Sequence, residues 1–165
     1  MQAICRTGRP YLEQGIRLRT MGNQNNIWLI PCSPKHFDAE GCFNKYGQIY
    51  WKQEGNFKNA KVGDMGFIYC SAPVKAIRYS FVIISINLPY TKAMDVEDEF
   101  TLDGSPNRDS STSTFLLVKL TGETTAPSLS YDSLRQNGLK GSVMSAMRLS
   151  QKKYEELYLY IEDNF

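Results

Sequence analysis

Two apolar runs separated by a very short connection constrain this chain most. "MGFIYCS" ends at residue 71 and "IRYSFVIISINLPY" begins at residue 77, so only "APVKA" lies between them. Both runs are rich in the β-branched and aromatic residues that favour strands. Parallel neighbours need a crossover of a dozen or more residues, whereas antiparallel neighbours can be joined by a tight turn. The spacing therefore predicts an antiparallel pair and disfavours a doubly wound parallel fold.

Other segments extend this pair into a larger sheet with flanking helices. "NIWLIPC" (26–32) and "TSTFLLVKL" (112–120) favour strands, and a short strand-like segment precedes Trp51. Signals for helix termini occur at three places, with Ser33, Pro34 and Gly47 bounding the first helix, Ser130 and Gly138 the second, and Ser150 opening the third. In the third helix, four apolar or aromatic residues fall on one face: Tyr154, Leu157, Tyr158 and Ile161. We predict an α+β domain with a curled sheet or small barrel and helices around it.

The length of 165 residues fits a single domain, which we place at residues 21–165. Residues 1–20 are expected to be a tail outside the fold, and residues 91–111 are expected to be a mobile acidic loop. No segment reaches the roughly 20 apolar residues that would span a bilayer, and residues 1–20 lack the apolar core of a secretory signal. These features predict a cytoplasmic protein without a membrane partner.

Charge and cysteine content exclude several kinds of site. Residues 21–92 hold eight Lys or Arg against four acids, while residues 93–133 hold eight acids against two bases. A basic first part is compatible with a polyanion partner, although ordinary surface scatter would give the same count. The cysteines at 5, 32, 42 and 70 form no C-x-x-C motif, and the single His36 cannot complete a zinc set. We therefore expect reduced thiols, no metal and no cofactor.

The sequence contains no recognisable catalytic motif. It lacks a G-x-S-x-G elbow, a P-loop and a G-x-G-x-x-G turn, and its single histidine, His36, forms no recognised Cys–His motif with Cys32 or Cys70. The acidic run "DVEDE" (95–99) is interpreted as a solvated charge run. We expect a binding protein with no catalytic residue. The nearest candidate for an acid or base in a small nucleotide-processing enzyme is Asp64.

The stretch "QIYWKQEGN" (48–56) places an indole among polar neighbours, which suggests that Trp51 is displayed while Tyr50 and Trp28 are packed. Trp51 could line a pocket with the aromatic residues and the turn that end the neighbouring strands, namely Tyr69, Tyr79, Ser71 and Ala72, and with the strand edge formed by Pro31, Cys32 and Ser33. A flat guest stacked on an aromatic side chain gains roughly 1–3 kcal/mol. Ser33 and Ser71 could read its polar edge, and Lys52, Lys75 and Arg78 could hold phosphates. Each tyrosine taken singly is more often a core or sheet-surface residue than a ligand contact.

Four segments of the chain together resemble the EVE domain, which belongs to the PUA-like group with the YTH and ASCH domains. They are "WLIPCSPKHFD", "IYWKQ", "VGDMGFIYCSAPVKAIRYSFVI" and "LRQNGLKGSVMSAMRLSQKKYEELYLYI", and the resemblance spans about residues 27–162. It implies a small curled β-barrel with flanking helices and binding of a modified base, in DNA for the versions attached to restriction nucleases. YTH relatives bind methylated adenine in RNA through an aromatic cage.

The resemblance also suggests site residues. It places the cage tryptophan at Trp51, one wall at Pro31, Cys32 and Ser33, and another at Tyr69, Cys70, Ser71 and Ala72. The second tryptophan common in YTH cages has no counterpart here, so Tyr69 or Tyr79 would take its place. A nuclease partner or fused nuclease domain would fit a reader of this kind.

The resulting hypothesis is a non-catalytic reader that flips a modified base, foremost a 5-modified cytosine in DNA, into a pocket. Three alternatives stay open: an RNA-binding PUA-like module, a small nucleotide-processing enzyme, and a protein-interaction domain without a nucleic-acid role.

Overall fold

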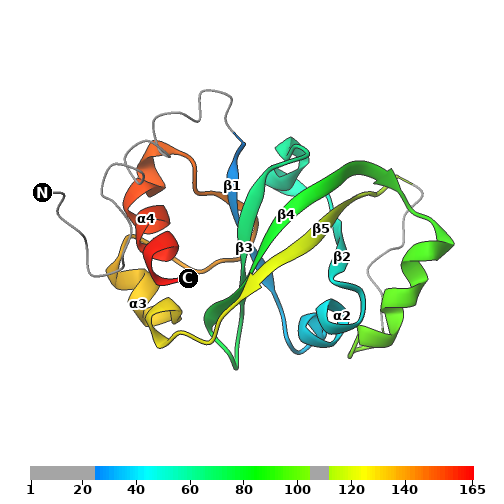
Figure 1. The fold of residues 1–165 in the computed structure, drawn as a ribbon, viewed down its shortest axis with the longest axis horizontal. Helices are drawn as coiled ribbons and strands as arrows, with labels where there is room; N and C mark the ends of the chain where they lie inside the picture. The colour runs from blue at the N-terminus through cyan, green and yellow to red at the C-terminus, as the bar shows by residue number, and fades with distance from the viewer. Residues whose placement is uncertain (1–24, 105–111) are drawn as a thin grey trace, which may run out of the picture.

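Six strands form one mixed sheet through the centre of the molecule (Figure 1). The computed structural model describes residues 25–104 and 112–165, so the predicted tail at 1–20 and residues 105–111 of the predicted loop lie outside it. In spatial order the strands are β2, β5, β4, β3, β1 and β6. Their bounds are β1 Ile27–Cys32, β2 Gln48–Lys52, β3 Met65–Cys70, β4 Ala76–Pro89, β5 Thr114–Glu123 and β6 Met147–Arg148. The sheet is curled and open, with β2 and β6 at its edges, and the predicted α+β class is confirmed.

The predicted antiparallel pair is present as β3 and β4. β1 runs parallel to β3, and the long segment between them is sufficient for the crossover that parallel strands need. β4 is antiparallel to both β3 and β5, so β1, β3 and β5 all point the same way. Their carboxyl ends therefore meet at a single edge of the sheet, beside the first residues of β4.

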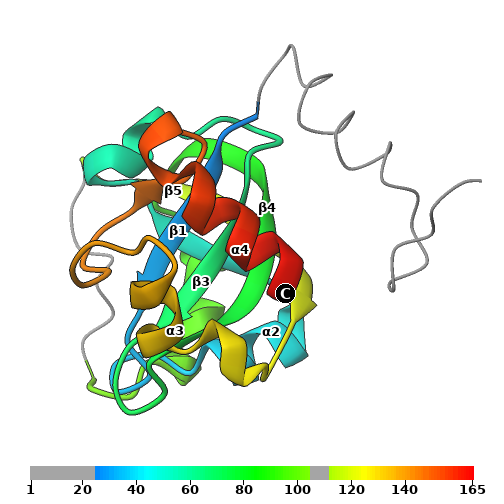
Figure 2. The ribbon, with the colours of Figure 1, turned by 90° about the vertical axis from the view of Figure 1, so that its left-hand side faces the viewer.

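Helices cover both faces of the sheet (Figures 1 and 2). α2 lies on one face, whereas α3 and α4 lie on the other, where α4 crosses the strands in Figure 2. The helices are α2 Ala39–Tyr46, α3 Tyr131–Gln136 and α4 Glu155–Asn164, and the 3-10 helices are η1 Gly55–Asn59, η2 Lys92–Phe100, η3 Pro127–Leu129 and η4 Lys152–Tyr154.

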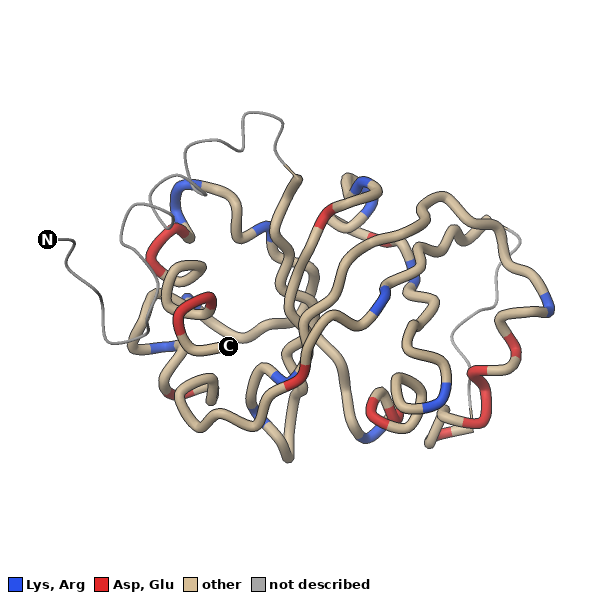
Figure 3. Tube along the Cα trace, in the orientation of Figure 1, with Lys and Arg blue, Asp and Glu red and all other residues tan. Residues whose placement is uncertain are grey.

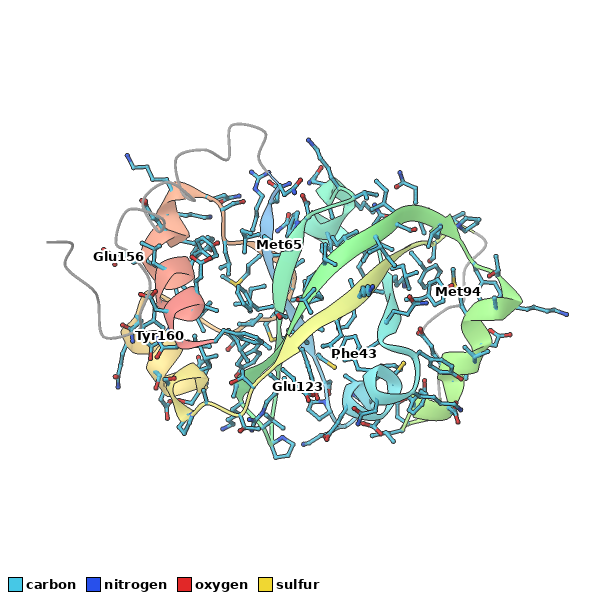
Figure 4. The ribbon with its side chains drawn as sticks, in the orientation of Figure 1. Phe43, Met65, Met94, Glu123, Glu156 and Tyr160 are labelled. Carbon is cyan, nitrogen blue, oxygen red and sulfur yellow. The ribbon has the colours of Figure 1, made fainter. Side chains whose placement is uncertain are left out.

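Two apolar clusters, one on each face, hold these layers together. Alternation along β1 sends Trp28, Ile30 and Cys32 into the cluster beneath α2, and Ile27 and Leu29 into the cluster beneath α3 and α4. Phe43 of α2 lies between that helix and the sheet, and Tyr160 belongs to α4 on the far side (Figure 4). The continuous apolar run "NIWLIPC" is thus explained by a strand that is buried on both sides.

A buried carboxylate fixes where β1 starts relative to β3. Asp64 is fully buried and accepts hydrogen bonds from the Asn26 backbone N–H (2.8 Å), the Trp28 Nε1–H (2.9 Å) and the Lys61 backbone N–H (2.9 Å). Its own backbone oxygen accepts from Ile83 of β4 (2.8 Å). The charge is satisfied by several donors, which is the condition for keeping an ionised group inside a protein.

Several local predictions need correction. The first helix begins at Ala39 with Asp38 as its N-cap, not at Ser33, because the Asp38 carboxylate accepts the Gly41 N–H (2.9 Å). Its predicted end is right, since Gly47 adopts the left-handed conformation with φ 68°. The final helix begins at Glu155 rather than near Ser150, although Leu157 and Ile161 are buried as predicted.

The described part of the acidic segment 91–111 contains a helix, contrary to the loop prediction. Its residues 92–100 form η2, in which Met94 and Glu97 are buried. Glu97 accepts the backbone N–H of Tyr50 at 2.9 Å, so the "DVEDE" run is not simply a solvated charge run. Within the described residues, no helix is both long enough and apolar enough to cross a membrane.

Replacing Asp64 with Asn should destabilise the fold. The substitution keeps the shape but turns one acceptor oxygen toward its donors as an N–H₂ group, and it removes the charge that strengthens the remaining bonds. We expect the free energy of unfolding to fall by roughly 2–3 kcal/mol in chemical denaturation. Asp163→Asn, an exposed change of the same kind on α4, is the matched control and should alter stability by less than about 0.5 kcal/mol. Equal stabilities of the two variants would contradict this assignment.

Candidate functional site

A pocket of about 660 Å³ opens at the edge of the sheet where β1, β3 and β5 end. Its walls come from those strand ends, from the turn between β3 and β4 with the first residues of β4, and from the segment that leads into α2. The lining residues are Cys32, Pro34, Phe37, Asp38, Ala39, Glu40, Cys70, Val74, Arg78, Tyr79, Leu102, Glu123, Thr124 and Thr125. The volume lies within the roughly 300–1,000 Å³ range of small-ligand sites.

Short backbone hydrogen bonds build the rim of this pocket. Ser71 donates its N–H to the Cys32 carbonyl (2.8 Å) and thereby joins the ends of β3 and β1. The Ser71 carbonyl accepts from Val74 (3.1 Å) and Lys75 (3.2 Å), which closes the turn into β4. On the opposite side, the segment before α2 is held by the segment after η2, because Leu102 donates to the His36 carbonyl (2.8 Å). The predicted "APVKA" turn is thus one wall of the site.

Charged residues of both signs line the pocket. Asp38, Glu40 and Glu123 supply three carboxylates, and Arg78 supplies the guanidinium. Arg78 also donates to the Thr124 carbonyl (3.5 Å), and its neighbour Tyr79 pairs with Glu123 across β4 and β5. Figure 3 shows both acidic and basic positions near the lower edge of the view. The lining favours a guest that presents hydrogen-bond donors.

Two cysteines lie side by side in the wall. Cys32 and Cys70 are directly opposite in the β1–β3 register, and both belong to the apolar cluster beneath α2. A hydrogen bond to Cys70, together with burial, raises the pKa of Cys32. The same hydrogen bond, from the Cys32 S–H, lowers the pKa of Cys70, and the nearby Arg78 adds to that effect. Cys70 is therefore the more readily ionised thiol of the pair.

Tyr79 forms an aromatic wall of the pocket. It is 8% exposed, and its ring is 5.3 Å from that of Phe43 between the centroids, with 52° between the planes. Burial raises the pKa of its phenol, with a further contribution from Cys70. The hydroxyl thus stays protonated at neutral pH. Of the residues predicted for the pocket wall, Cys32, Cys70 and Tyr79 line this pocket, together with Arg78, which was predicted to contact phosphates.

Trp51 does not line this pocket. It lies in β2 rather than in a loop, it is half-buried, and it packs against the apolar cluster beneath α2. Trp51 pairs with Leu116 of β5, whereas Glu123 at the pocket is seven positions further along that strand. Seven residues of extended strand span about 24 Å. The polar flanks of Trp51 reflect an edge strand and the turn that follows it.

Tyr69 points to the opposite face of the sheet. It is buried in the cluster beneath α3 and α4, with its ring 6.3 Å from that of Tyr131. Burial, with Tyr131 second, raises the pKa of its phenol. Alternation along the strands explains this, since Cys70 faces the pocket and its neighbour must face away. Trp51 and Tyr69 therefore cannot form one cage.

The remaining predicted residues frame the pocket without lining it. Ser33 accepts the N–H groups of His36 and Phe37 (both 3.0 Å), and Ser71 shapes the turn already described. Pro31 is half-buried on β1, and Ala72 is exposed at the tip of that turn. Among the predicted phosphate contacts, Lys75 is exposed beside Val74 of the pocket wall, whereas Lys52 sits in β2 with its ammonium 3.6 Å from Glu54.

Sequence reasoning missed the carboxylates and two apolar walls, Phe37 and Leu102. One signal was present: the residues after several strands are brought together if those strands point the same way. Using this signal requires knowing that β1 and β3 are parallel, which the sequence did not show.

Asp64, the candidate for an enzymatic acid or base, is buried among structural donors and does not line the pocket. Among the described residues, no group of three or more His, Cys, Asp or Glu could hold a metal ion.

The ionisation of Cys70 should depend on Cys32. In Cys32→Ala the hydrogen bond to the Cys70 sulfur is lost, so the pKa of Cys70 rises. In a Cys5→Ser background, the midpoint of the pH–rate profile for alkylation of Cys70 should move up by about one pH unit, and the rate at pH 7 should fall. Peptide mass spectrometry gives the rate at each thiol. Cys42→Ala removes a buried thiol outside the pocket and should leave the profile unchanged; a downward shift in Cys32→Ala would refute the assignment.

Comparison with known proteins identifies the fold. No family model and no curated protein matches the chain. Among solved structures, human THYN1 in complex with 5-methylcytosine-containing DNA is similar with a TM-score of 0.54 and 17% identity, covering 82% of this chain and 98% of that one. ASCH from Zymomonas mobilis is similar with a TM-score of 0.55 and 13% identity over 81% and 94% of the two chains.

A protein from Pseudomonas putida gives the same result, with a TM-score of 0.53 and 21% identity, covering 81% of this chain and 97% of that one. These similarities extend over almost the whole length of each neighbour. The curled mixed sheet, its flanking helices and these neighbours together show that the chain has the PUA-like fold of the ASCH and EVE domains.

Proposed function

We propose that this chain is a non-catalytic nucleic-acid reader that accepts one flipped base, with 5-modified cytosine in DNA as the preferred guest. The observation that carries the proposal is the pocket at the strand ends, which combines aromatic walls, carboxylates and a guanidinium in one cavity. The likeness of the fold to THYN1, whose structure contains 5-methylcytosine DNA, supports the same class of ligand.

The aromatic and apolar lining suits a flat guest. Phe37 and Tyr79 supply rings, and base–aromatic stacking is worth roughly 1–3 kcal/mol per base. Val74 and Leu102 supply apolar contacts that a methyl group on the base can bury. A base that leaves the duplex loses its stacking energy there, and contacts of this kind in the pocket offset that loss.

The carboxylates select the edge of the base. Asp and Glu side chains accept hydrogen bonds from the exocyclic amine of cytosine, whereas thymine presents a carbonyl oxygen at the same position. With three carboxylates in the lining, a base with an amine edge is favoured over thymine or uracil. Tyr79 and Arg78 can donate to the remaining acceptors of cytosine.

Basic side chains at the rim supply the contacts to phosphates. Lys35 follows Pro34, and Lys75 follows Val74, so both exposed ammonium groups stand next to lining residues. Phosphate contacts position the nucleic acid without reading its sequence. Lys52 belongs to the distant β2 and takes no part in this scheme. Cleavage of bound DNA would fall to a nuclease partner or a fused domain.

The proposal predicts a ranking of affinities. A duplex with a single 5-methylcytosine should bind about fourfold more tightly than the same duplex with cytosine, because one buried methyl is worth about 0.8 kcal/mol. Thymine at that position should bind at least about fivefold more weakly than 5-methylcytosine. Fluorescence anisotropy at fixed salt measures all three. Equal affinity for the three duplexes would refute base reading, and tighter binding of a methylated RNA would assign the site to RNA.

Filling the pocket should abolish this preference. Val74→Trp places an indole against the lining and should reduce affinity for the 5-methylcytosine duplex to that of unmodified DNA. Val62→Trp is the matched control: Val62 is 57% exposed and precedes the start of β3, at the other end of that strand. Circular dichroism should show both variants folded. Undiminished discrimination by folded Val74→Trp would place the base elsewhere.

A further inference from the structure

We propose that Cys32 and Cys70 form a redox-modifiable dithiol in the pocket wall, which hydrogen peroxide converts into a disulfide. The inference starts from the register of β1 and β3, in which these two residues are direct partners. It concerns the chemistry of the protein's own thiols and needs no bound nucleic acid.

The geometry of the two strands suits a disulfide. Neighbouring strands lie about 4.8 Å apart, and disulfides bridge Cα atoms that are about 4.4–6.8 Å apart. Both thiols point to the same face, because both residues belong to the cluster beneath α2. The register is held on each side of the pair, by Pro31 opposite Tyr69 and by the Ser71 N–H on the Cys32 carbonyl (2.8 Å). The spacing and the shared face of the two residues therefore suit a bond between their sulfurs.

The pocket gives a small oxidant access to these buried thiols. Cys32 and Cys70 are 6% and 4% exposed, yet both contribute to the lining of a cavity of about 660 Å³. A neutral molecule of two oxygen atoms fits such a space, and the three carboxylates of the lining do not repel it. Cys42, by contrast, is completely buried beneath α2 and lines no part of this pocket.

The neighbouring groups assign distinct roles to the two sulfurs. Arg78 and the Cys32 S–H both favour the thiolate of Cys70, so Cys70 is the attacking sulfur and Cys32 the resolving one. The Cys70 thiolate attacks one oxygen of the peroxide, the O–O bond breaks, and the departing hydroxide takes a proton to become water. Cys70 is thereby oxidised to a sulfenic acid.

The second step forms the disulfide. The Cys32 sulfur attacks the sulfenic sulfur of Cys70, the S–O bond breaks, and the hydroxide leaves as water with the proton of the Cys32 thiol. In total, two thiols lose two hydrogens and one peroxide becomes two waters. A thiol reductant reverses the change by exchange at the disulfide.

The test treats the wild-type protein with hydrogen peroxide, blocks the remaining thiols with an alkylating reagent, and maps the peptides by mass spectrometry. We expect a Cys32–Cys70 linked pair, lighter by about 2 mass units than the sum of its thiol peptides and lost on reduction. Cys42 should be found as a free thiol. Recovery of Cys32 and Cys70 as separate alkylated or over-oxidised peptides would overturn the proposal, and so would a link to another cysteine.

Variants separate the two roles and supply the control. In Cys32→Ser, peroxide should leave Cys70 as a sulfenic acid that a dimedone probe traps, whereas Cys70→Ser should suppress oxidation at Cys32. Cys42→Ser should form the Cys32–Cys70 bond as the wild type does. Trapping at Cys32 rather than Cys70 would overturn the assigned roles.

The bond should also alter the pocket, an expectation that rests on the proposed function. Oxidation removes an ionisable sulfur and an S–H donor from the lining, so the affinity for a 5-methylcytosine duplex should fall several-fold and recover on reduction. Because the linked peptide is detected without nucleic acid, a protein that binds no DNA would leave the mapping result intact. A disulfide that leaves the affinity unchanged would overturn this consequence alone.

Discussion

The buried carboxylate of Asp64 is the interaction on which the rest of the structure depends. It ties the start of β1, through Asn26 and Trp28, to the turn at Lys61 that leads into β3. Its backbone continues the same connection to Ile83 of β4. A strand shifted by one residue would turn every side chain to the other face, so the hydrogen bonds of this charged group help to determine which residues of β1 and β3 meet.

The consequences appear at the opposite ends of the same strands. With Ile27 set against Met65, the ladder necessarily places Cys32 against Cys70. The parallel direction of β1, β3 and β5 then gathers their final residues at one edge, where no strand continues and a cavity can open. A structural carboxylate at one end thus determines the composition of the pocket at the other. Glu123, labelled in Figure 4, marks where β5 reaches that edge.

Sequence patterns predicted the elements better than the site. The tight link between residues 71 and 77 gave the β3–β4 hairpin, and the spacing of Leu157 and Ile161 gave the buried face of α4. The site prediction grouped Trp51 with Tyr69, which the sheet places on different strands and opposite faces. Polar neighbours made Trp51 seem displayed, yet they belong to an edge strand whose indole packs inward. Exposure of one residue cannot be inferred from its flanks when a sheet alternates faces.

The sequence by itself determined the α+β class, the antiparallel hairpin, the burial of Trp28 and the absence of familiar catalytic motifs, because these depend on local propensity, spacing and composition. Only the tertiary structure decided that β1 runs parallel to β3, that the acids Asp38, Glu40 and Glu123 share one cavity with Arg78, and that Cys32 faces Cys70. These pairings join residues that are distant in the sequence. Their physical cause is the strand register. Long-range hydrogen bonds, such as those of Asp64, and the two-sided burial of β1 set this register, and no local sequence pattern encodes it.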